Sequence, residues 1–141
     1  MKKKIVITIE GKPLAKSRPR IFSRGGRSFA YDKQADQMKL MREIIRGQFQ
    51  SPLVKGPLSM QLTFYFQVPK SFPKKKFHAA IQKELHHTTK PDLDNLIKMY
   101  SDLCNSLVYN DDRQIVELIA SKCYSLTEYT VIEIFYEDEK K

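Results

Sequence analysis

The sequence predicts one small α+β domain in which a mixed or antiparallel sheet packs against helices. The chain has 141 residues, the length of one ordinary domain, and 41% of them are hydrophobic, which is enough for a single core. Segments with the two-residue repeat of a strand and segments with the three-to-four-residue repeat of a helix occur in the same chain. Because no internal repeat or low-complexity linker divides the sequence, we treat residues 1–141 as one domain.

The first half of the chain is expected to contain two strands, a hairpin arm and a helix. Residues 4–10 are rich in β-branched side chains, as in a strand. Residues 28–31 follow two glycines and are expected to return as one arm of a short hairpin. Asp32 is expected to cap a helix over residues 33–50, in which hydrophobic residues recur at helical spacing. Residues 58–68 alternate hydrophobic and polar side chains, which predicts a half-buried strand.

The second half is expected to contain two helices followed by two strands. Residues 71–84 are typical of a basic helix opened by Pro73. After a polar stretch, a hydrophobic stripe predicts a helix over residues 93–107. Residues 114–125 and 129–137 are rich in β-forming side chains and are expected to form an antiparallel pair.

The positive charge of the chain is confined to its first third. Residues 1–50 contain 13 Lys and Arg against 4 Asp and Glu, whereas residues 51–141 contain 12 of each, so the net charge of +9 lies in the first segment. Such asymmetry indicates a polyanionic partner, with nucleic acid favoured over a membrane because a long basic helix with aromatic anchors is lacking. A second basic run follows the central strand, and for both runs the alternative is a solvated surface. The candidate DNA-binding residues of the two runs are Lys16, Arg18, Arg20, Lys74, Lys75 and Lys76.

The sequence argues against a membrane or disulfide-rich protein. No stretch approaches about 18 consecutive apolar residues, and the apolar run over residues 5–9 is too short for a signal-peptide core. We therefore expect a cytoplasmic protein with no membrane partner. Cys104 and Cys123 have neither zinc-site spacing nor the companions of a disulfide framework, so we expect buried, reduced thiols.

Aspartates are concentrated in one short part of this basic protein. The segment of residues 92–112 contains Asp92, Asp94, Asp102, Asp111 and Asp112. Carboxylates near a surface that binds a polyanion would repel it unless a cation lay between them, which indicates a divalent metal such as Mg²⁺, a hard ion that prefers oxygen ligands. The alternative is that these residues serve only as helix-dipole partners, i,i+4 pairs and turn residues.

The spacing of this segment also has a geometric interpretation. Asp92 and Asp94 can converge if the first is extended and the second lies at the start of a helix. Lys98 then lies one turn into the helix, where it can meet a phosphate. Either Asp111 or Asp112 would return from the following loop.

Three segments resemble a known family. Residues 90–98 read KPDLDNLIK, Asp102 follows, and residues 108–115 read VYNDDRQI. Together they resemble the signature of the RusA family of Holliday junction resolvases. Residues 11–20, which read GKPLAKSRPR, resemble the N-terminal motif of its phage and Gram-positive members. The resemblance spans roughly residues 4–137.

The resemblance implies a small, homodimeric, Mg²⁺-dependent endonuclease with an α+β fold that cuts four-way DNA junctions symmetrically. Position by position, the essential carboxylates of the family match Asp92, Asp94 and Asp112, and its essential lysine matches Lys98. The gap before the acidic pair varies by one residue within the family, so Asp111 remains an alternative to Asp112. The three carboxylates would hold the metal, and the lysine would offset charge on the scissile phosphate.

His87 also recurs in relatives with this N-terminal motif and is a candidate DNA contact, although a histidine in a polar loop is more often only solvated. Two other functions remain open. One is a catalytically silent DNA-binding module of the same fold, and the other is a less selective Mg²⁺-dependent nuclease that acts on flaps or forks.

Overall fold

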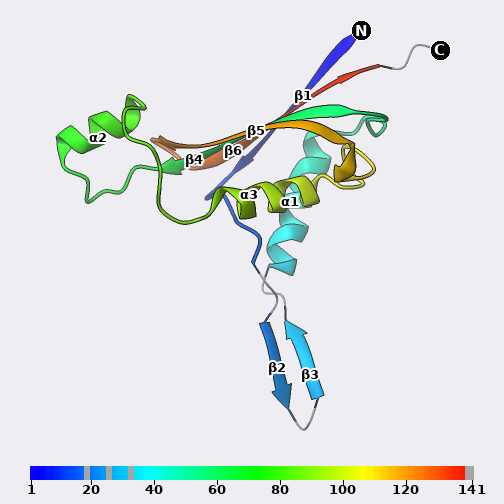
Figure 1. Ribbon diagram of the computed structural model, residues 1–141, viewed down its shortest axis with the longest axis horizontal. Helices are drawn as coiled ribbons and strands as arrows, with labels where there is room; N and C mark the ends of the chain where they lie inside the picture. Colours follow the sequence, from blue (N-terminus) through cyan, green and yellow to red (C-terminus); the bar gives the residue numbers. More distant parts are fainter. Residues whose placement is uncertain (18–19, 25–26, 32–33, 139–141) are drawn as a thin grey trace.

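The computed structural model describes residues 1–17, 20–24, 27–31 and 34–138, and its centre is a four-stranded mixed sheet with the order β1-β6-β4-β5 (Figure 1). Strand β6 runs antiparallel to both β1 and β4, whereas β4 and β5 run parallel. This sheet and its helices confirm the predicted α+β class. The strands are β1 (Lys2–Glu10), β4 (Leu58–Gln67), β5 (Ile115–Ser125) and β6 (Tyr129–Glu137).

The expectation that the last two strands form an antiparallel pair is wrong. Strand β4 lies between them, and it pairs in parallel with β5 from Leu58↔Ile115 to Gln67↔Ser125 while its other edge pairs with β6. Residues 126–128 therefore carry the chain past the end of β4. The physical reason is that β4 has the most deeply buried face, so it takes a central position, where both of its edges are hydrogen-bonded.

One face of the sheet is covered by the helices α1 (Ala35–Gln48) and α3 (Leu93–Leu103) (Figure 1). The core lies between this face and the two helices. The inward side chains of β4 are at most 3% exposed, as the alternating sequence pattern predicts. Of the two free thiols, Cys104 is buried in this core and Cys123 is partly exposed. The buried side chains of α3 are Leu96, Met99, Tyr100, Ser101 and Leu103.

Helix α3 ends four residues earlier than its hydrophobic stripe predicts. Beyond Leu103 the chain turns through Ser106, whose φ is 66°, and the N–H of Ser106 donates to the carbonyl of Tyr109 at 2.7 Å. The hydroxyl of Tyr109 donates to the carbonyl of Ser101 at 2.6 Å. The stripe continues past the helix because Leu107 packs against the core from this turn.

The other elements agree with the sequence in type and differ at their ends. Helix α1 is shorter than the expected 33–50, and Asp32 lies outside the described residues. Helix α2 (Lys74–Ile81) begins directly after Pro73. Strands β2 (Arg20–Arg24) and β3 (Arg27–Tyr31) form an antiparallel hairpin away from the central sheet (Figure 1), which confirms the expected return arm. Within the described ranges, no helix is long and apolar enough to span a bilayer.

Candidate functional site

The start of α3 carries two aspartates outside the core. Asp92 directly precedes the helix with extended backbone (φ −69°, ψ 140°), and Asp94 lies in the first turn. Both side chains are exposed. The carboxylate of Asp92 makes no capping hydrogen bond. Oδ1 of Asp94 accepts a hydrogen bond from the N–H of the next residue, Asn95, at 2.9 Å. Two accessible carboxylates therefore lie at the positive end of the helix dipole.

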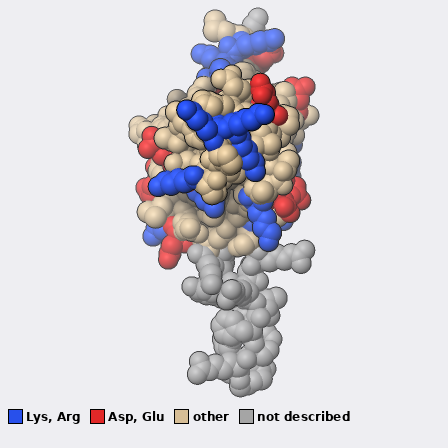
Figure 2. All heavy atoms as spheres, turned by 90° about the vertical axis from the view of Figure 1, so that its left-hand side faces the viewer, with Lys and Arg blue, Asp and Glu red and all other residues tan. Residues whose placement is uncertain are grey.

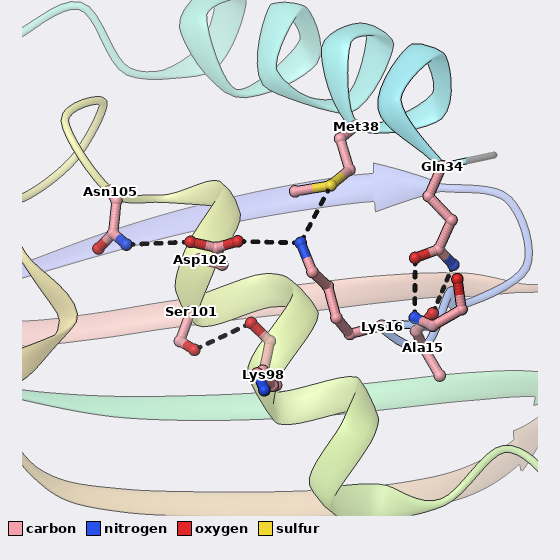
Figure 3. A network of polar contacts seen from close by, with 9 residues as sticks. Ala15, Lys16, Gln34, Met38, Lys98, Ser101, Asp102 and Asn105 are labelled. Carbon is pink, nitrogen blue, oxygen red and sulfur yellow. Dashed lines mark hydrogen bonds and ion pairs between the residues drawn. The ribbon is translucent and has the colours of Figure 1, made fainter. Parts of the chain in front are cut away.

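Lys98 lies one turn beyond Asp94 on the exposed side of α3. Its carbonyl accepts a hydrogen bond from Oγ of Ser101 at 3.3 Å (Figure 3). Its amine has no hydrogen bond or ion pair to any residue that the structure describes. This ammonium group is therefore available to an anion bound near the start of the helix.

Asp102, near the other end of α3, is engaged within the protein. Its Oδ2 atom lies 3.1 Å from Nζ of Lys16, and its Oδ1 atom accepts a hydrogen bond from Nδ2 of Asn105 at 3.2 Å (Figure 3). Nζ of Lys16 also lies 3.4 Å from Sδ of Met38. The side chain of Lys16 is only 25% exposed, so a phosphate would have to share this ammonium group with Asp102.

Asp111 and Asp112 lie at the start of the 3-10 turn Asp112–Gln114. Oδ1 of Asp111 accepts a hydrogen bond from the N–H of Arg113 at 3.1 Å, and Oε1 of Gln114 accepts one from the N–H of Asp111 at 3.1 Å, which forms a capping box. A hydrogen bond with Asp111 raises the pKa of Asp112, with smaller contributions from burial and from the charges of Asp111 and Asp102. The N–H of Arg113 lowers the pKa of Asp111. The two adjacent carboxyl groups therefore titrate together.

The single chain does not gather the three predicted metal ligands. Asp92 and Asp94 begin α3, whereas the carboxylates whose charges act on Asp112 are Asp111 and Asp102. The axial rise from Asp94 to Asp102 is about 12 Å. Across residues 1–17, 20–24, 27–31 and 34–138, no three His, Cys, Asp or Glu side chains are arranged to hold a metal ion. The accessible pair at the start of α3 still fits Mg²⁺, which commonly takes one or two carboxylates and keeps several waters.

The segment of residues 11–17 is fastened across α3 and to the start of α1. The N–H of Leu14 donates to the hydroxyl of Tyr100 at 3.1 Å, and the N–H of Lys16 donates to the carbonyl of Asn95 at 3.0 Å. Gln34 accepts from the N–H of Ser17 at 2.9 Å and donates to the carbonyl of residue 15 at 2.6 Å (Figure 3). The chain therefore enters the β2–β3 hairpin from a fixed position beside α3.

The remaining basic candidates lie at two places. Arg18 lies outside the described residues, and Arg20 is the first residue of β2, with a side chain that is also outside them. Figure 2 shows Lys and Arg side chains gathered over the α2 end of the molecule. The exposed lysines at the start of α2 are Lys74, Lys75 and Lys76.

His87, a candidate DNA contact, lies inside the protein. Its side chain is 8% exposed, and its ring stacks on Phe66 with centroids 4.1 Å apart. The ring of Tyr124 lies 5.0 Å away. Burial lowers the pKa of His87, and the positive charge of Lys122 lowers it further. In this conformation the imidazole supports the loop from within and is not presented at the surface.

The comparison with known sequences identifies the family. Residues 10–135 match the family described as Endodeoxyribonuclease RusA. The chain belongs to the RusA family. The chain is also 38% identical over 125 residues to the uncharacterized protein YqaN of Bacillus subtilis (strain 168), covering 86% of this chain and 88% of that protein. The match confirms the resemblance predicted from the motifs and places the chain in a family of nucleases that act on DNA.

The RusA motif region is hydrogen-bonded to a side chain that lies far along the chain. Nζ of Lys122, on β5, donates to the carbonyl of Thr89 at 2.7 Å and to the carbonyl of Pro91 at 2.9 Å. These contacts span 33 and 31 positions, so no local pattern indicates them. Gln34 and Tyr100 were missed for the same reason, because their bonds to residues 14–17 also connect distant segments.

Proposed function

We propose that this RusA-family protein is a Mg²⁺-dependent endonuclease that resolves four-way DNA junctions by symmetric hydrolysis of phosphodiester bonds. The observation that carries the proposal is the accessible pair Asp92 and Asp94, with the exposed side chain of Lys98 one turn farther along α3. Carboxylates bind a hard divalent cation, and a neighbouring ammonium group binds an anion. A metal-assisted phosphoryl transfer needs both kinds of group.

In this proposal Asp92 and Asp94 hold the metal and fix its position at the helix start. The bound Mg²⁺ would lower the pKa of a water molecule and polarise the scissile phosphate. Lys98 would stabilise the negative charge that develops on the phosphate oxygens. The products would be a 5′-phosphate and a 3′-hydroxyl.

The third proposed ligand is Asp112, with Asp111 as the alternative. Both residues lie beyond the C-terminal end of α3, away from the first two carboxylates. Asp112 would join them through movement of its own turn on DNA binding or through pairing of two subunits. The proposal therefore assigns the first two aspartates to the free subunit and the third to the assembled complex.

DNA would be held mainly through its phosphates. Lysines in a helix and arginines in a projecting hairpin can bind the backbone without reading bases. Lys and Arg side chains gather over the α2 end of the molecule (Figure 2), and the hairpin projects from the body (Figure 1). The residues proposed for this work are Lys16, Arg18, Arg20, Lys74, Lys75, Lys76 and, if its loop opens, His87.

We further infer a cytoplasmic homodimer as the working unit. A four-way junction has near two-fold symmetry, so a two-fold dimer with one site per subunit can place two opposed cuts. The sheet face opposite the helices carries Val6, Ile119 and Phe135, which are 51%, 57% and 38% exposed. Exposed apolar side chains on one sheet face are candidates for subunit pairing, and on this face Glu133 and Gln61 lie between Val6 and Ile119.

Cleavage of a synthetic mobile four-way junction, with Mg²⁺ and with EDTA, tests the proposal. We expect paired cuts in opposed strands that require the metal. Flap and fork substrates of equal length serve as controls, since comparable cleavage of all three would indicate the less selective nuclease. Tight binding without cleavage at any metal concentration would indicate the catalytically silent DNA-binding module.

A further inference from the structure

The end of the loop that leads into Asp92 is fastened to the sheet by the side chain of Lys122. Residues 82–92 contain no helix or strand. Lys122 lies on the helix-covered face of β5, at the position paired with Phe64. From there its amine donates to the carbonyls of Thr89 and Pro91, at 2.7 Å and 2.9 Å.

We propose that Lys122 is a positioning residue that holds the backbone before Asp92 and so sets the place of both aspartates at the start of α3. The inference rests on the proposed function in assigning metal binding to these aspartates. The carbonyl of Pro91 belongs to the peptide group whose N–H is that of Asp92. Fixing this carbonyl therefore fixes the peptide plane from which the carboxylate-bearing residue extends.

The chemistry of the contact suits a lysine. An ammonium group has three donors and no acceptor, so it can bind two carbonyls at once. Hydrogen bonds from a charged donor are about twice as strong as neutral ones. Because Lys122 is only partly exposed, water competes less for these carbonyls than it would on an open surface. A strand paired along its length provides a firm base for the side chain.

The loop also contacts strands β4 and β5 through the ring of His87. The ring of His87 stacks on Phe66, and Tyr124, two residues beyond Lys122 on the same face of β5, lies 5.0 Å from the imidazole. On the helix side, the carbonyl of Asp92 accepts a hydrogen bond from the N–H of Leu96 at 3.2 Å. The backbone is thus fixed before and after the first aspartate, and Lys122 provides the nearest contact on the loop side.

Three variants test the role of Lys122. Lys122→Met removes the donors and keeps the apolar stem, Lys122→Arg keeps a cation that can donate to two carbonyls, and Lys55→Met removes one charge from an exposed loop outside the site. Amide hydrogen exchange of the metal-free proteins provides a readout that needs neither metal nor substrate. We expect Lys122→Met to speed exchange of the first hydrogen-bonded amide of α3, that of Leu96, which donates to the carbonyl of Asp92, by about tenfold, with β4 unchanged, and Lys122→Arg to restore most of the protection.

Metal binding provides the second readout. Removal of an outer-shell hydrogen bond typically weakens metal affinity by about 10- to 100-fold. We therefore expect Lys122→Met to weaken Mn²⁺ binding, measured by electron paramagnetic resonance, and to raise the half-saturating Mg²⁺ for cleavage by that factor. Junction affinity in EDTA should stay within twofold of the parent protein, and Lys55→Met should change none of these values.

Several outcomes would overturn the proposal. Unchanged exchange and unchanged Mn²⁺ affinity would show that Lys122 does not set this backbone. A decrease in junction affinity with a salt slope smaller by about 0.9 would place the amine on a phosphate instead. Should Lys122→Met fail to fold, Lys122→Gln takes its place in the same measurements. If the parent protein cleaves no junction, the proposed function fails, while exchange and Mn²⁺ binding still decide the positioning role.

Discussion

The amine of Lys16 and the carboxylate of Asp102 form an ion pair, with Nζ 3.1 Å from Oδ2, between segments 86 positions apart (Figure 3). The pair connects the segment that leads to the β2–β3 hairpin with the C-terminal part of α3. Their side chains are 25% and 39% exposed, so solvent screens the attraction only in part.

Breaking this pair should destabilise the fold. We expect Lys16→Met to lower the free energy of unfolding by about 1 kcal/mol, and a double-mutant cycle with Asp102→Asn to give a coupling of roughly 0.5–1 kcal/mol. Urea unfolding monitored by circular dichroism measures both values. The more exposed pair Arg46–Glu43, with side chains 56% and 60% exposed, is the control and should couple more weakly. A coupling near zero for Lys16 and Asp102 would contradict the expectation.

The carboxylates at the start of α3 should be needed for cleavage but not for binding. We expect Asp92→Asn or Asp94→Asn to reduce junction cleavage by on the order of 10² or more, because a metal ligand is removed. Gel-shift titration in EDTA should show junction affinity retained or increased, since a negative charge facing phosphate is removed. Asp36→Asn is a matched control, because Asp36 occupies the first turn of α1. Near-normal cleavage by either variant at moderate Mg²⁺ would show that the metal assignment is wrong.

Asp112 should be more important than Asp111. We expect Asp112→Asn to reduce cleavage by on the order of 10², and Asp111→Asn to have a smaller effect because asparagine can still cap the 3-10 turn. Single-turnover cleavage at saturating protein measures both rates without the contribution of binding. The opposite order of effects would identify Asp111 as the ligand.

Lys98 and the α2 lysines should affect different steps. We expect Lys98→Ala to lower the single-turnover rate with little change in affinity. Joint replacement of Lys74, Lys75 and Lys76 by alanine should weaken binding and flatten its salt dependence by roughly 0.9 log unit for each phosphate that is no longer neutralised. Affinity measured at several salt concentrations separates the two effects. Equal decreases of affinity in both variants would place Lys98 on the binding surface.

Local patterns predicted the elements, whereas the contacts between distant segments could not be predicted. The alternation of hydrophobic and polar side chains over residues 58–68 shows which face is buried, so this strand could be predicted from the sequence. The partners of β5 and β6 depend on β4, which lies far from both in the sequence. The role of Lys122 could not be predicted for the same reason, because the carbonyls that it contacts are more than 30 positions away in the sequence.

The acidic motif predicts one part of the candidate site from the sequence alone. It identified the aspartates at the start of α3 because their two-residue spacing and the helix start are local features. It could not show that the charge of Asp102 acts on Asp112, because that depends on where α3 ends and how the chain returns.

The stability of the protein should depend on pH through His87. Burial and the nearby charge of Lys122 hold the pKa of His87 below 6.5, so the folded protein binds this proton less readily than the unfolded chain does. As the pH falls below about 6.5, the unfolded chain takes up the proton first, and the free energy of unfolding decreases until the folded pKa is reached. Above that range this contribution is constant.

Replacement of His87 by phenylalanine should remove this dependence. Phenylalanine can keep the stacking on Phe66 but cannot titrate, so the decrease between pH 7.5 and 5.5 in urea unfolding should be smaller than in the parent protein. The neighbouring His86 is exposed and serves as the control, since His86→Gln should leave the decrease unchanged. An equal decrease in the parent protein and His87→Phe would mean that other groups cause the acid destabilisation. Lys122→Met should raise the pKa of His87, measured by the chemical shifts of its ring, because one nearby positive charge is removed.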